Sequence, residues 1–308
     1  MKNSLYLKAA FAIISFIMLT VLSSCASRGD VQAEEYFSLG MAYFELGNYS
    51  EAEKWLNRAR TADKTMIASE YNLGRIAFET GRFAEAAGYF ERILTRDPEN
   101  VMALKAAAYS RIKNGDLEKA EALYNRVLAL VPESSDDGFN YALVLYSIHK
   151  YEKCEEVLNI YPFALEENPF SMLLLARAQK AQNKIEAVDT YAKWAAMTDN
   201  AGVRELYEYA QVLETADFYA RSLEQYDKAL NIDDIGDLKR SGLRFEKARI
   251  LLFADPENVE GLKELIVSVN EGFSDIEAME ALLKNERIKK ENRDEIRKII
   301  DGLISVPK

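Results

Sequence analysis

Few residues in this 308-residue chain are of a type that could catalyse a reaction. The single histidine, His149, has no cysteine or carboxylate pair near it at a spacing that binds a metal ion or activates a nucleophile. The pairs Asp136-Asp137 and Asp233-Asp234 are candidate cation ligands, but aspartate also favours helix N-termini, which is the preferred interpretation. No Gly-rich phosphate loop, zinc motif or nucleophile elbow is present. We therefore expect no enzymatic activity, no cofactor and no metal.

Cys25 is the residue with the most specific chemistry. It follows an apolar run, Ala9 to Leu22, that has the length of a signal-peptide core and is too short to span a bilayer. The segment Leu22-Ser23-Ser24-Cys25 resembles the lipobox of bacterial lipoproteins, in which a peptidase cleaves before the cysteine and the thiol receives diacylglycerol. The resemblance implies a signal peptide at residues 1–24, a lipid on Cys25 and a tether over residues 25–32. An uncleaved anchor, or an ordinary secretory signal with a chance cysteine, is the alternative.

The charge of the exported part restricts its partners. Without Lys2 and Lys8 the chain has 37 basic and 50 acidic residues, a formal charge of −13. This balance argues against nucleic acid as a partner, and it means that membrane attachment needs a covalent anchor. Ala26, which follows the cysteine, favours the outer over the inner membrane by resemblance to enteric sorting rules. The second cysteine, Cys154, then has no disulfide partner and is expected to be a small buried residue.

The elements that must position any binding residues recur at a fixed spacing along the chain. Small residues occupy equivalent positions at Gly40, Gly74, Ala108, Ala142, Ala176 and Ala210. Nine residues after each comes a bulky apolar residue: Tyr49, Phe83, Leu117, Tyr151, Ile185 and Tyr219. Three residues later comes Ala52, Ala86, Ala120, Cys154, Val188 and Ser222. A constant period of about 34 residues indicates a stack of supersecondary units.

Each unit must be a pair of antiparallel helices. The small residues let the two helix axes approach closely, and the bulky residues wedge between successive hairpins. Gly47, Gly81 and Gly115 lie between the helices, where a left-handed residue ends the first helix. Pro98 and Pro132 suit the breaks between units. The chain has only 14 Gly and 6 Pro, and Ala, Leu, Glu and Lys are plentiful, so composition also predicts an all-α protein.

The first unit resembles the signature of the tetratricopeptide-repeat (TPR) family nearly position by position. The residues that carry the resemblance are Tyr36, Leu39, Gly40, Tyr43, Gly47, Tyr49, Ala52, Leu56 and Ala59. The resemblance implies a right-handed superhelical solenoid of helical hairpins. It covers six units over residues 33–236: 33–66, 67–100, 101–134, 135–168, 169–202 and 203–236. The fourth unit departs from the pattern at His149 and ends early at Pro162, and the fifth has Ala192 at a usually aromatic position.

The 34-residue spacing is not kept after residue 236. Asp255-Pro256-Glu257-Asn258 repeats the Asp97-Pro98-Glu99-Asn100 tetrapeptide, yet the next small residue of the series, Ala248, lies four residues beyond the position that the spacing predicts. We predict an irregular seventh hairpin within residues 237–271. Terminal helices over residues 275–285 and 291–303, within 272–308, are expected to form a charged C-terminal cap.

In this family the first helix of each hairpin lines the concave face, through its positions two, five, nine, twelve and thirteen. Carried over to this sequence, those positions predict a groove lined by Phe37, Met41, Phe44, Tyr71, Arg75, Phe78, Lys105, Tyr109, Phe139, Leu143, Tyr146, Leu173, Arg177 and Tyr207. Aromatic residues dominate binding interfaces, and the three basic residues are candidates to receive a ligand carboxylate. The alternative is that the rings pack between adjacent first helices and that the basic residues are ordinary solvated charges.

Two functions fit this pattern. The first is a membrane-anchored scaffold that binds protein partners through its groove in a periplasm-facing assembly of the bacterial cell envelope. Its layout resembles the TPR lipoproteins of outer-membrane assembly and pilus biogenesis. The second resembles the TPR accessory lipoproteins of TRAP-type transporters, in which a pore or groove handles a hydrophobic small ligand. A TPR fold alone does not choose between them.

Overall fold

The computed structural model describes residues 31–236, 238–254 and 259–305. Every regular element in these ranges is a helix and none is a strand, so the all-α fold class is confirmed. The chain divides into two compact units, Met1–Lys150 and Tyr151–Lys308, which we call unit 1 and unit 2. The predicted signal peptide and Cys25 lie outside the described residues. Among the described helices, none combines the length and the apolar character needed to cross a membrane.

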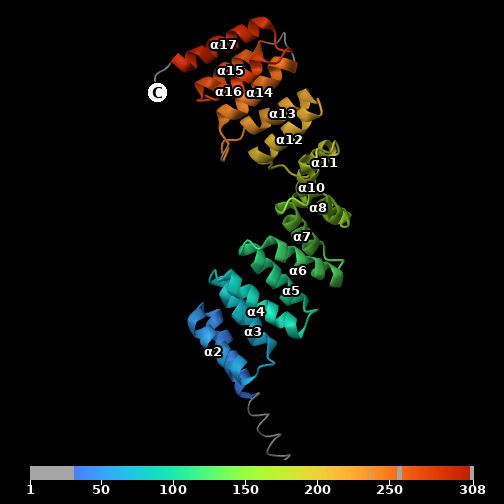
Figure 1. Ribbon diagram of the computed structural model, residues 1–308, viewed down its shortest axis with the longest axis vertical. Helices are drawn as coiled ribbons and strands as arrows, with labels where there is room; N and C mark the ends of the chain where they lie inside the picture. The colour runs from blue at the N-terminus through green and yellow to red at the C-terminus, as the bar shows by residue number, and fades with distance from the viewer. Residues whose placement is uncertain (1–30, 237, 255–258, 306–308) are drawn as a thin grey trace, which may run out of the picture. The chain divides into compact units, whose positions relative to one another are not determined.

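Unit 1 consists of antiparallel helices that pack against one another in chain order (Figure 1). Its first described helix covers residues 31–45. It is followed by α2 (Tyr49–Ala62), α3 (Ile67–Glu79), α4 (Phe83–Arg96), α5 (Val101–Lys113), α6 (Leu117–Leu130) and α7 (Ser135–Ser147). Side chains cap several of these helices: Asn48, Asn100 and Ser134 each accept a backbone N–H from the first turn. Such caps satisfy donors that the helix itself leaves unpaired.

Unit 2 contains the remaining helices. They are α8 (Tyr151–Asn159), α9 (Pro162–Glu167), α10 (Pro169–Ala181), α11 (Ala187–Ala196), α12 (Val203–Thr215), α13 (Tyr219–Leu230), α14 (Arg240–Ala254), α15 (Glu260–Asn270), α16 (Ile276–Leu283) and α17 (Lys290–Ser305). Where the fourth repeat was expected to end, Pro162 instead starts the short helix α9, a position that suits proline because no N–H is needed there. As a result α10 is packed by α8, α9 and α11.

The small residues of the repeat stand where helices approach most closely. A Cβ on Gly40 would lie 2.7 Å from Cγ of Leu56, and one on Gly74 would lie 2.8 Å from the ring of Phe90. The alanines at the equivalent positions are fully buried: Ala108, Ala142, Ala176 and Ala210. Each first helix therefore presents a small residue to the core at this position of the repeat.

The turn inside each hairpin recurs with the same period. Its left-handed residues are Gly47 (φ 71°), Gly81 (φ 76°), Gly115 (φ 83°), His149 (φ 61°), Asn183 (φ 55°) and Asp217 (φ 61°). The next residue donates its N–H to a carbonyl five residues back, as from Arg82 to Ala77 at 2.8 Å and from Phe218 to Leu213 at 2.8 Å. This is the Schellman arrangement of a helix C-terminus. His149 therefore departs from the sequence pattern without changing the turn.

Helices α14 to α17 share a core of their own. Its buried residues are Phe245, Ala248, Leu252, Leu265, Met279, Leu282, Ile288, Ile296 and Ile300. Phe245 stacks on Phe273 with ring centroids 4.1 Å apart. On α17 the charged residues Arg297 and Lys298 are exposed beside the buried Ile296 and Ile300, so the helix is amphipathic.

Candidate functional site

The predicted groove residues of α3 and α5 form a concave surface, which we call the α3–α5 groove. It encloses about 140 Å³ and is lined by Tyr71, Arg75, Phe78, Glu79, Phe90, Ala106, Tyr109 and Ser110. Four of these were predicted from the first-helix rule: Tyr71, Arg75, Phe78 and Tyr109. The groove lies entirely within unit 1.

The rings of the α3–α5 groove are ordered by contacts with one another. Phe78 stacks on Tyr109 with centroids 5.2 Å apart, and it also packs edge-to-face with Phe83 at 5.2 Å. Tyr71 packs against the buried Phe90, also at 5.2 Å. Tyr109 is nevertheless 47% exposed. The groove thus offers a fixed aromatic surface that still has area to bury against a ligand.

Arg75 supplies the positive charge beside these rings. Its Nη1 donates to Oδ1 of Asn72 at 3.0 Å, and its guanidinium lies 4.5 Å from the centroid of Phe44. Within the described residues Arg75 forms no ion pair. A guanidinium has about five N–H donors, so most of those on Arg75 are available to an incoming carboxylate.

The other two predicted basic residues already form ion pairs within the chain. The Nζ of Lys105 lies 2.5 Å from Oδ2 of Asp137, whose side chain is 7% exposed. Arg177 contacts Glu208 at 2.7 Å and Glu205 at 2.9 Å. These acids come from the first helix of the following hairpin, so both basic residues join neighbouring repeats.

The remaining predicted residues differ in exposure. Leu143 is 40% exposed, whereas Phe37, Met41, Phe139 and Tyr146 in unit 1 are half-buried. Tyr207 in unit 2 is half-buried and meets the edge of Tyr226 with centroids 6.0 Å apart. Leu173 is only 7% exposed and belongs to the core, because α10 is packed by three neighbouring helices.

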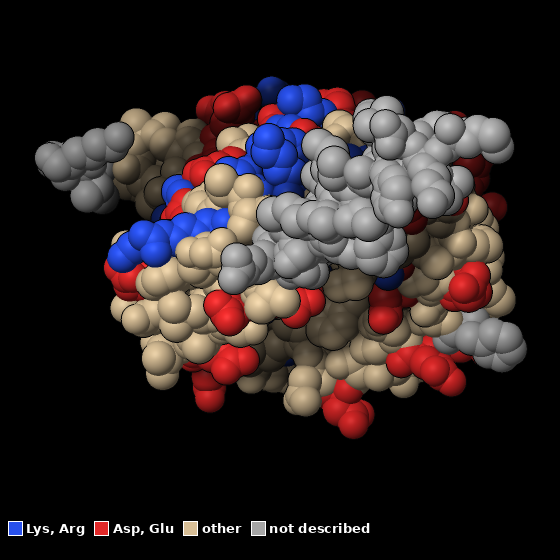
Figure 2. Space-filling view, turned by 90° about the horizontal axis from the view of Figure 1, so that it is seen from below, with Lys and Arg blue, Asp and Glu red and all other residues tan. Residues whose placement is uncertain are grey.

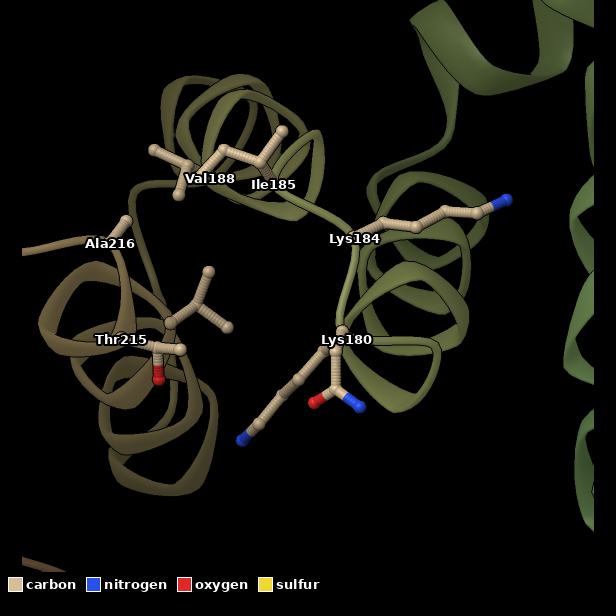
Figure 3. Close-up of a pocket in the computed structure, with 8 residues that line it drawn as sticks. Lys180, Lys184, Ile185, Val188, Thr215 and Ala216 are labelled. Atoms are coloured by element: carbon tan, nitrogen blue, oxygen red, sulfur yellow. The ribbon is translucent and has the colours of Figure 1, made fainter.

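A second cavity, of about 260 Å³, lies in unit 2 between the α10–α11 turn and α12. It is lined by Lys180, Asn183, Lys184, Ile185, Val188, Val212, Thr215 and Ala216. Ile185 was expected to wedge between hairpins but is 65% exposed, because α11 starts only at Ala187 and leaves it in the turn. In Figure 3, Ile185 and Val188 flank the opening on one side and Thr215 and Ala216 on the other, while Lys184 points away.

Lys180 is the polar group of this cavity. Its Nζ donates to Oε1 of Gln211 at 2.8 Å. Burial lowers the pKa of Lys180, and neighbouring Arg177 lowers it further, while Glu208 acts in the opposite direction. Lys180 stands at position twelve of its helix, so the same family rule that selected Leu173 and Arg177 would also have found it.

Residues that could perform covalent or metal chemistry are sparse. Within the described ranges, no three His, Cys, Asp or Glu side chains are grouped so as to hold a metal ion. His149 is exposed in its left-handed turn. Cys154 is fully buried, and burial raises the pKa of its thiol to about 12. A thiol in that state is a poor nucleophile.

Comparisons with known proteins bear on the repeat. Family models of the tetratricopeptide repeat match residues 33–65 and 71–135. The chain contains tetratricopeptide repeats. Both matched segments belong to unit 1, and the second includes most of α3 and all of α5. A search of curated proteins found no match to the chain.

Several solved structures share the TPR fold. A tetratricopeptide repeat protein from Parabacteroides merdae matches with 17% identity and a TM-score of 0.54, over 89% of this chain and 99% of that one. PilF of Pseudomonas aeruginosa matches with 18% identity and a TM-score of 0.52, over 71% of this chain and 99% of that one. YrrB, a TPR protein with an unusual peptide-binding site, matches with 15% identity and a TM-score of 0.52, over 58% and 92%. At these identities the likeness concerns the fold.

Proposed function

We propose that this TPR protein is a lipid-anchored scaffold of the bacterial cell envelope, which holds a protein partner in the α3–α5 groove. TPR repeats are protein-interaction modules, and the groove supports this role through one observation. An exposed, ordered aromatic surface lies beside Arg75, whose guanidinium has no carboxylate partner among the described residues. Aromatic and arginine residues contribute most of the binding energy at protein interfaces.

The chemistry of the groove defines the partner segment. The stacked pair Phe78 and Tyr109 favours an apolar or aromatic side chain, and Arg75 favours a carboxylate next to it. An extended or helical peptide with an acidic residue adjoining an apolar one provides both. The same fold carries a peptide-binding site in YrrB.

The test of the groove is partner retention by variants. The lipidated protein is crosslinked and purified from its native membranes, and co-purifying proteins are quantified by mass spectrometry. We expect Y109A and R75Q to bind the partner about 5- to 150-fold more weakly and to retain correspondingly less of it, since each removes a contact worth about 1–3 kcal/mol. F218A is the matched control, because Phe218 is 44% exposed, similar to Tyr109 at 47%, but lies in unit 2. Equal retention by Y109A, R75Q and F218A would refute the groove.

The anchor is tested separately. Metabolic labelling with a palmitate analogue should label the wild-type chain and leave C25S unlabelled, and C25S should leave the membrane fraction. Density-gradient separation of the membranes then tests the outer-membrane location. A labelled C25S chain, or a wild-type chain without label, would contradict lipidation at this cysteine.

A second function, solute handling as in accessory lipoproteins of TRAP-type transporters, is favoured by the unit 2 cavity. Val188 and Val212 give it apolar walls, and Lys180 gives it a cation, which together suit a small organic acid. Extraction of small molecules from the purified protein distinguishes the two functions. A bound organic acid with no stable protein partner would favour solute handling.

A further inference from the structure

Unit 1 contains a second polar feature, separate from the α3–α5 groove, where α2, α3 and α4 meet. It is a pocket of about 400 Å³ lined by Arg60, Thr61, Lys64, Glu70, Arg92, Thr95 and Arg96. We call it the basic pocket. It contains four cationic side chains and one carboxylate, in a chain whose formal net charge is −11.

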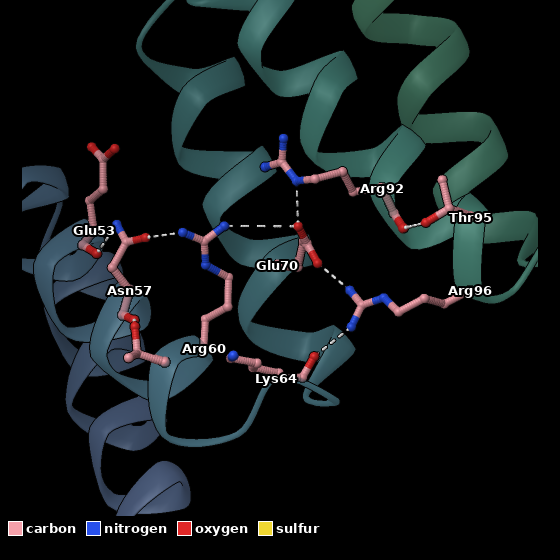
Figure 4. A network of polar contacts seen from close by, with 9 residues as sticks. Glu53, Asn57, Arg60, Lys64, Glu70, Arg92, Thr95 and Arg96 are labelled. Atoms are coloured by element: carbon pink, nitrogen blue, oxygen red, sulfur yellow. Dashed lines mark hydrogen bonds and ion pairs between the residues drawn. The ribbon is translucent and has the colours of Figure 1, made fainter.

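Glu70 stands at the centre of the basic pocket and is nearly inaccessible, with its side chain 8% exposed. The Nε of Arg92 donates to Oε1 of Glu70 at 2.6 Å, Arg96 hydrogen-bonds to Oε2, and Nη1 of Arg60 lies 4.0 Å from Oε1. Figure 4 shows the three guanidiniums converging on this carboxylate.

One carboxylate does not balance this cluster. Among the lining residues, three guanidiniums and the ammonium of Lys64 face the carboxylate of Glu70, a surplus of three positive charges. Asp63, outside the lining, offsets part of this surplus through its interaction with Arg96. Among the described residues the Nζ of Lys64 forms no ion pair. Pairing Glu70 requires a single guanidinium, so the surplus charge is left for an external anion.

The arginines are held in position while their donors stay accessible. Arg92 lies 4.3 Å from the ring centroid of Tyr89, Arg96 donates to the carbonyl of Lys64 at 2.7 Å, and Arg60 donates to Asn57 at 3.0 Å. Their side chains are nevertheless 49%, 35% and 37% exposed, respectively. Each guanidinium has about five N–H donors, of which these contacts use one or two. The pocket is therefore ordered before a ligand arrives.

Surface charge is unevenly distributed on the face that Figure 2 presents. Most of the Lys and Arg side chains visible in Figure 2 lie in the upper part of the face, where Asp and Glu side chains lie among them, and Asp and Glu predominate in the lower part. A concentration of positive charge on an acidic protein raises the local concentration of anions.

We propose that the basic pocket binds a phosphate group. Arginine clusters suit phosphate because their planar forks donate two parallel hydrogen bonds to its oxygens, and a doubly charged group offsets most of the surplus charge. The phosphate has two sources, the headgroup of a phospholipid or a soluble phosphate compound. This inference does not rest on the proposed scaffold function, because none of its residues lines the α3–α5 groove.

The test is a calorimetric titration of the purified full-length chain with inorganic phosphate at constant ionic strength, with chloride as the reference anion. We expect wild type to bind phosphate and R92Q to bind it about tenfold more weakly, since a charge-assisted hydrogen bond is lost. R126Q is the matched control. Arg126 occupies the equivalent position one repeat later and donates to the carbonyl of Pro98, but Leu104 replaces the central glutamate there.

E70Q separates a binding site from a merely structural cluster. Removing the competing carboxylate should increase phosphate affinity, whereas a structural ion-pair cluster would lose stability without gaining affinity. K64Q replaces R92Q if that variant fails to fold, because Lys64 is exposed and its ammonium forms no ion pair among the described residues. Absence of phosphate binding by wild type, or equal affinity of wild type, R92Q and K64Q, would overturn the proposal.

Vesicles distinguish the source of the phosphate. Phosphatidylcholine vesicles with and without phosphatidylglycerol are mixed with the C25S chain, which lacks the proposed lipid, and with C25S carrying R92Q, and bound protein is measured by flotation. Binding that requires both phosphatidylglycerol and Arg92 identifies a lipid headgroup. Binding of inorganic phosphate without Arg92-dependent flotation identifies a soluble phosphate compound.

Discussion

A substitution at Gly261 tests how closely helices α14 and α15 approach each other. It is buried near the start of α15, and a Cβ on it would lie 2.9 Å from the backbone nitrogen of Leu252 and 2.8 Å from Cγ of the same residue. Leu252 is fully buried in α14, so its backbone has little room to move. We predict that G261A destabilises unit 2.

The size of the effect is the difference between two terms. Overpacking of a core costs about 1–3 kcal/mol, and replacing glycine by alanine within a helix returns about 0.5–1 kcal/mol. The net loss for G261A therefore lies between about 0 and 2.5 kcal/mol, centred near about 1 kcal/mol. G242A is the matched control, because Gly242 lies in α14 and a Cβ there would have no neighbouring atom within 4 Å, so only the stabilising term applies.

Urea unfolding followed by far-UV circular dichroism measures both variants. Hydrogen exchange with mass spectrometry shows whether the loss is confined to the amides of α14 and α15. We expect G261A to be less stable than wild type and G242A to be more stable. A change of the same sign in both variants would refute the assignment of a close helix contact at Gly261.

Three further predictions concern the turns, an acid-sensitive ion pair and the buried thiol. G81A should cost about 1–2 kcal/mol in urea unfolding, because Gly81 has a φ of 76°, although its added methyl would touch nothing; unchanged stability would contradict this. Burial raises the pKa of Glu264, but hydrogen bonds from Lys247 and Arg244 outweigh burial and lower that pKa. The ionised Glu264 therefore stabilises the folded chain fully above about pH 4.5, and this stabilisation is lost as pH falls through the lowered pKa. The melting temperature of E264Q should then depend less on pH in acid than that of wild type, and identical pH profiles would rule this out. In a C25S background, Cys154 should react with iodoacetamide at about pH 8 only after unfolding, because burial raises its pKa to about 12; rapid labelling of the folded chain would show that the thiol is accessible.

The helices could be predicted because the repeat carries redundant information. The small residue, the bulky residue and the turn residue recur at one spacing, so a departure at one position does not hide the hairpin. His149 is such a departure, yet it adopts the same left-handed conformation as Gly81 because the helices on both sides require that turn. The helix α9 was missed because a proline that ends one helix pattern also begins another.

The binding residues were predicted less completely, because exposure depends on neighbours that lie one repeat away. Lys105 and Arg177 have the positions of groove residues but are paired by acids of the next first helix. A search for acids nearly one repeat downstream of each basic residue would have found these pairs. Leu173 is buried on α10, which packs against α8, α9 and α11, and no feature of its own helix indicates this burial.

The basic pocket was missed because its charges come from different repeats. Arg60 and Lys64 are one helical turn apart in the sequence, as are Arg92 and Arg96, and nearly one whole repeat separates the two pairs. Because successive repeats stack, residues nearly one repeat apart can lie close together, and all four charges line the same pocket. The two pairs of basic residues are present in the sequence, but their proximity can be predicted only when adjacent repeats are aligned with each other.

The regular spacing of the left-handed turns has a consequence for how this chain can change in evolution. Gly81 and Gly115 occupy equivalent positions in successive repeats and have nearly the same backbone conformation and the same following hydrogen bond. A recombination event that joins one to the other removes one complete hairpin and leaves the flanking helices with intact ends. Unequal crossing-over at these turns would lengthen or shorten the array by whole repeats, whereas a single-residue insertion within a helix would rotate its buried face away from the core.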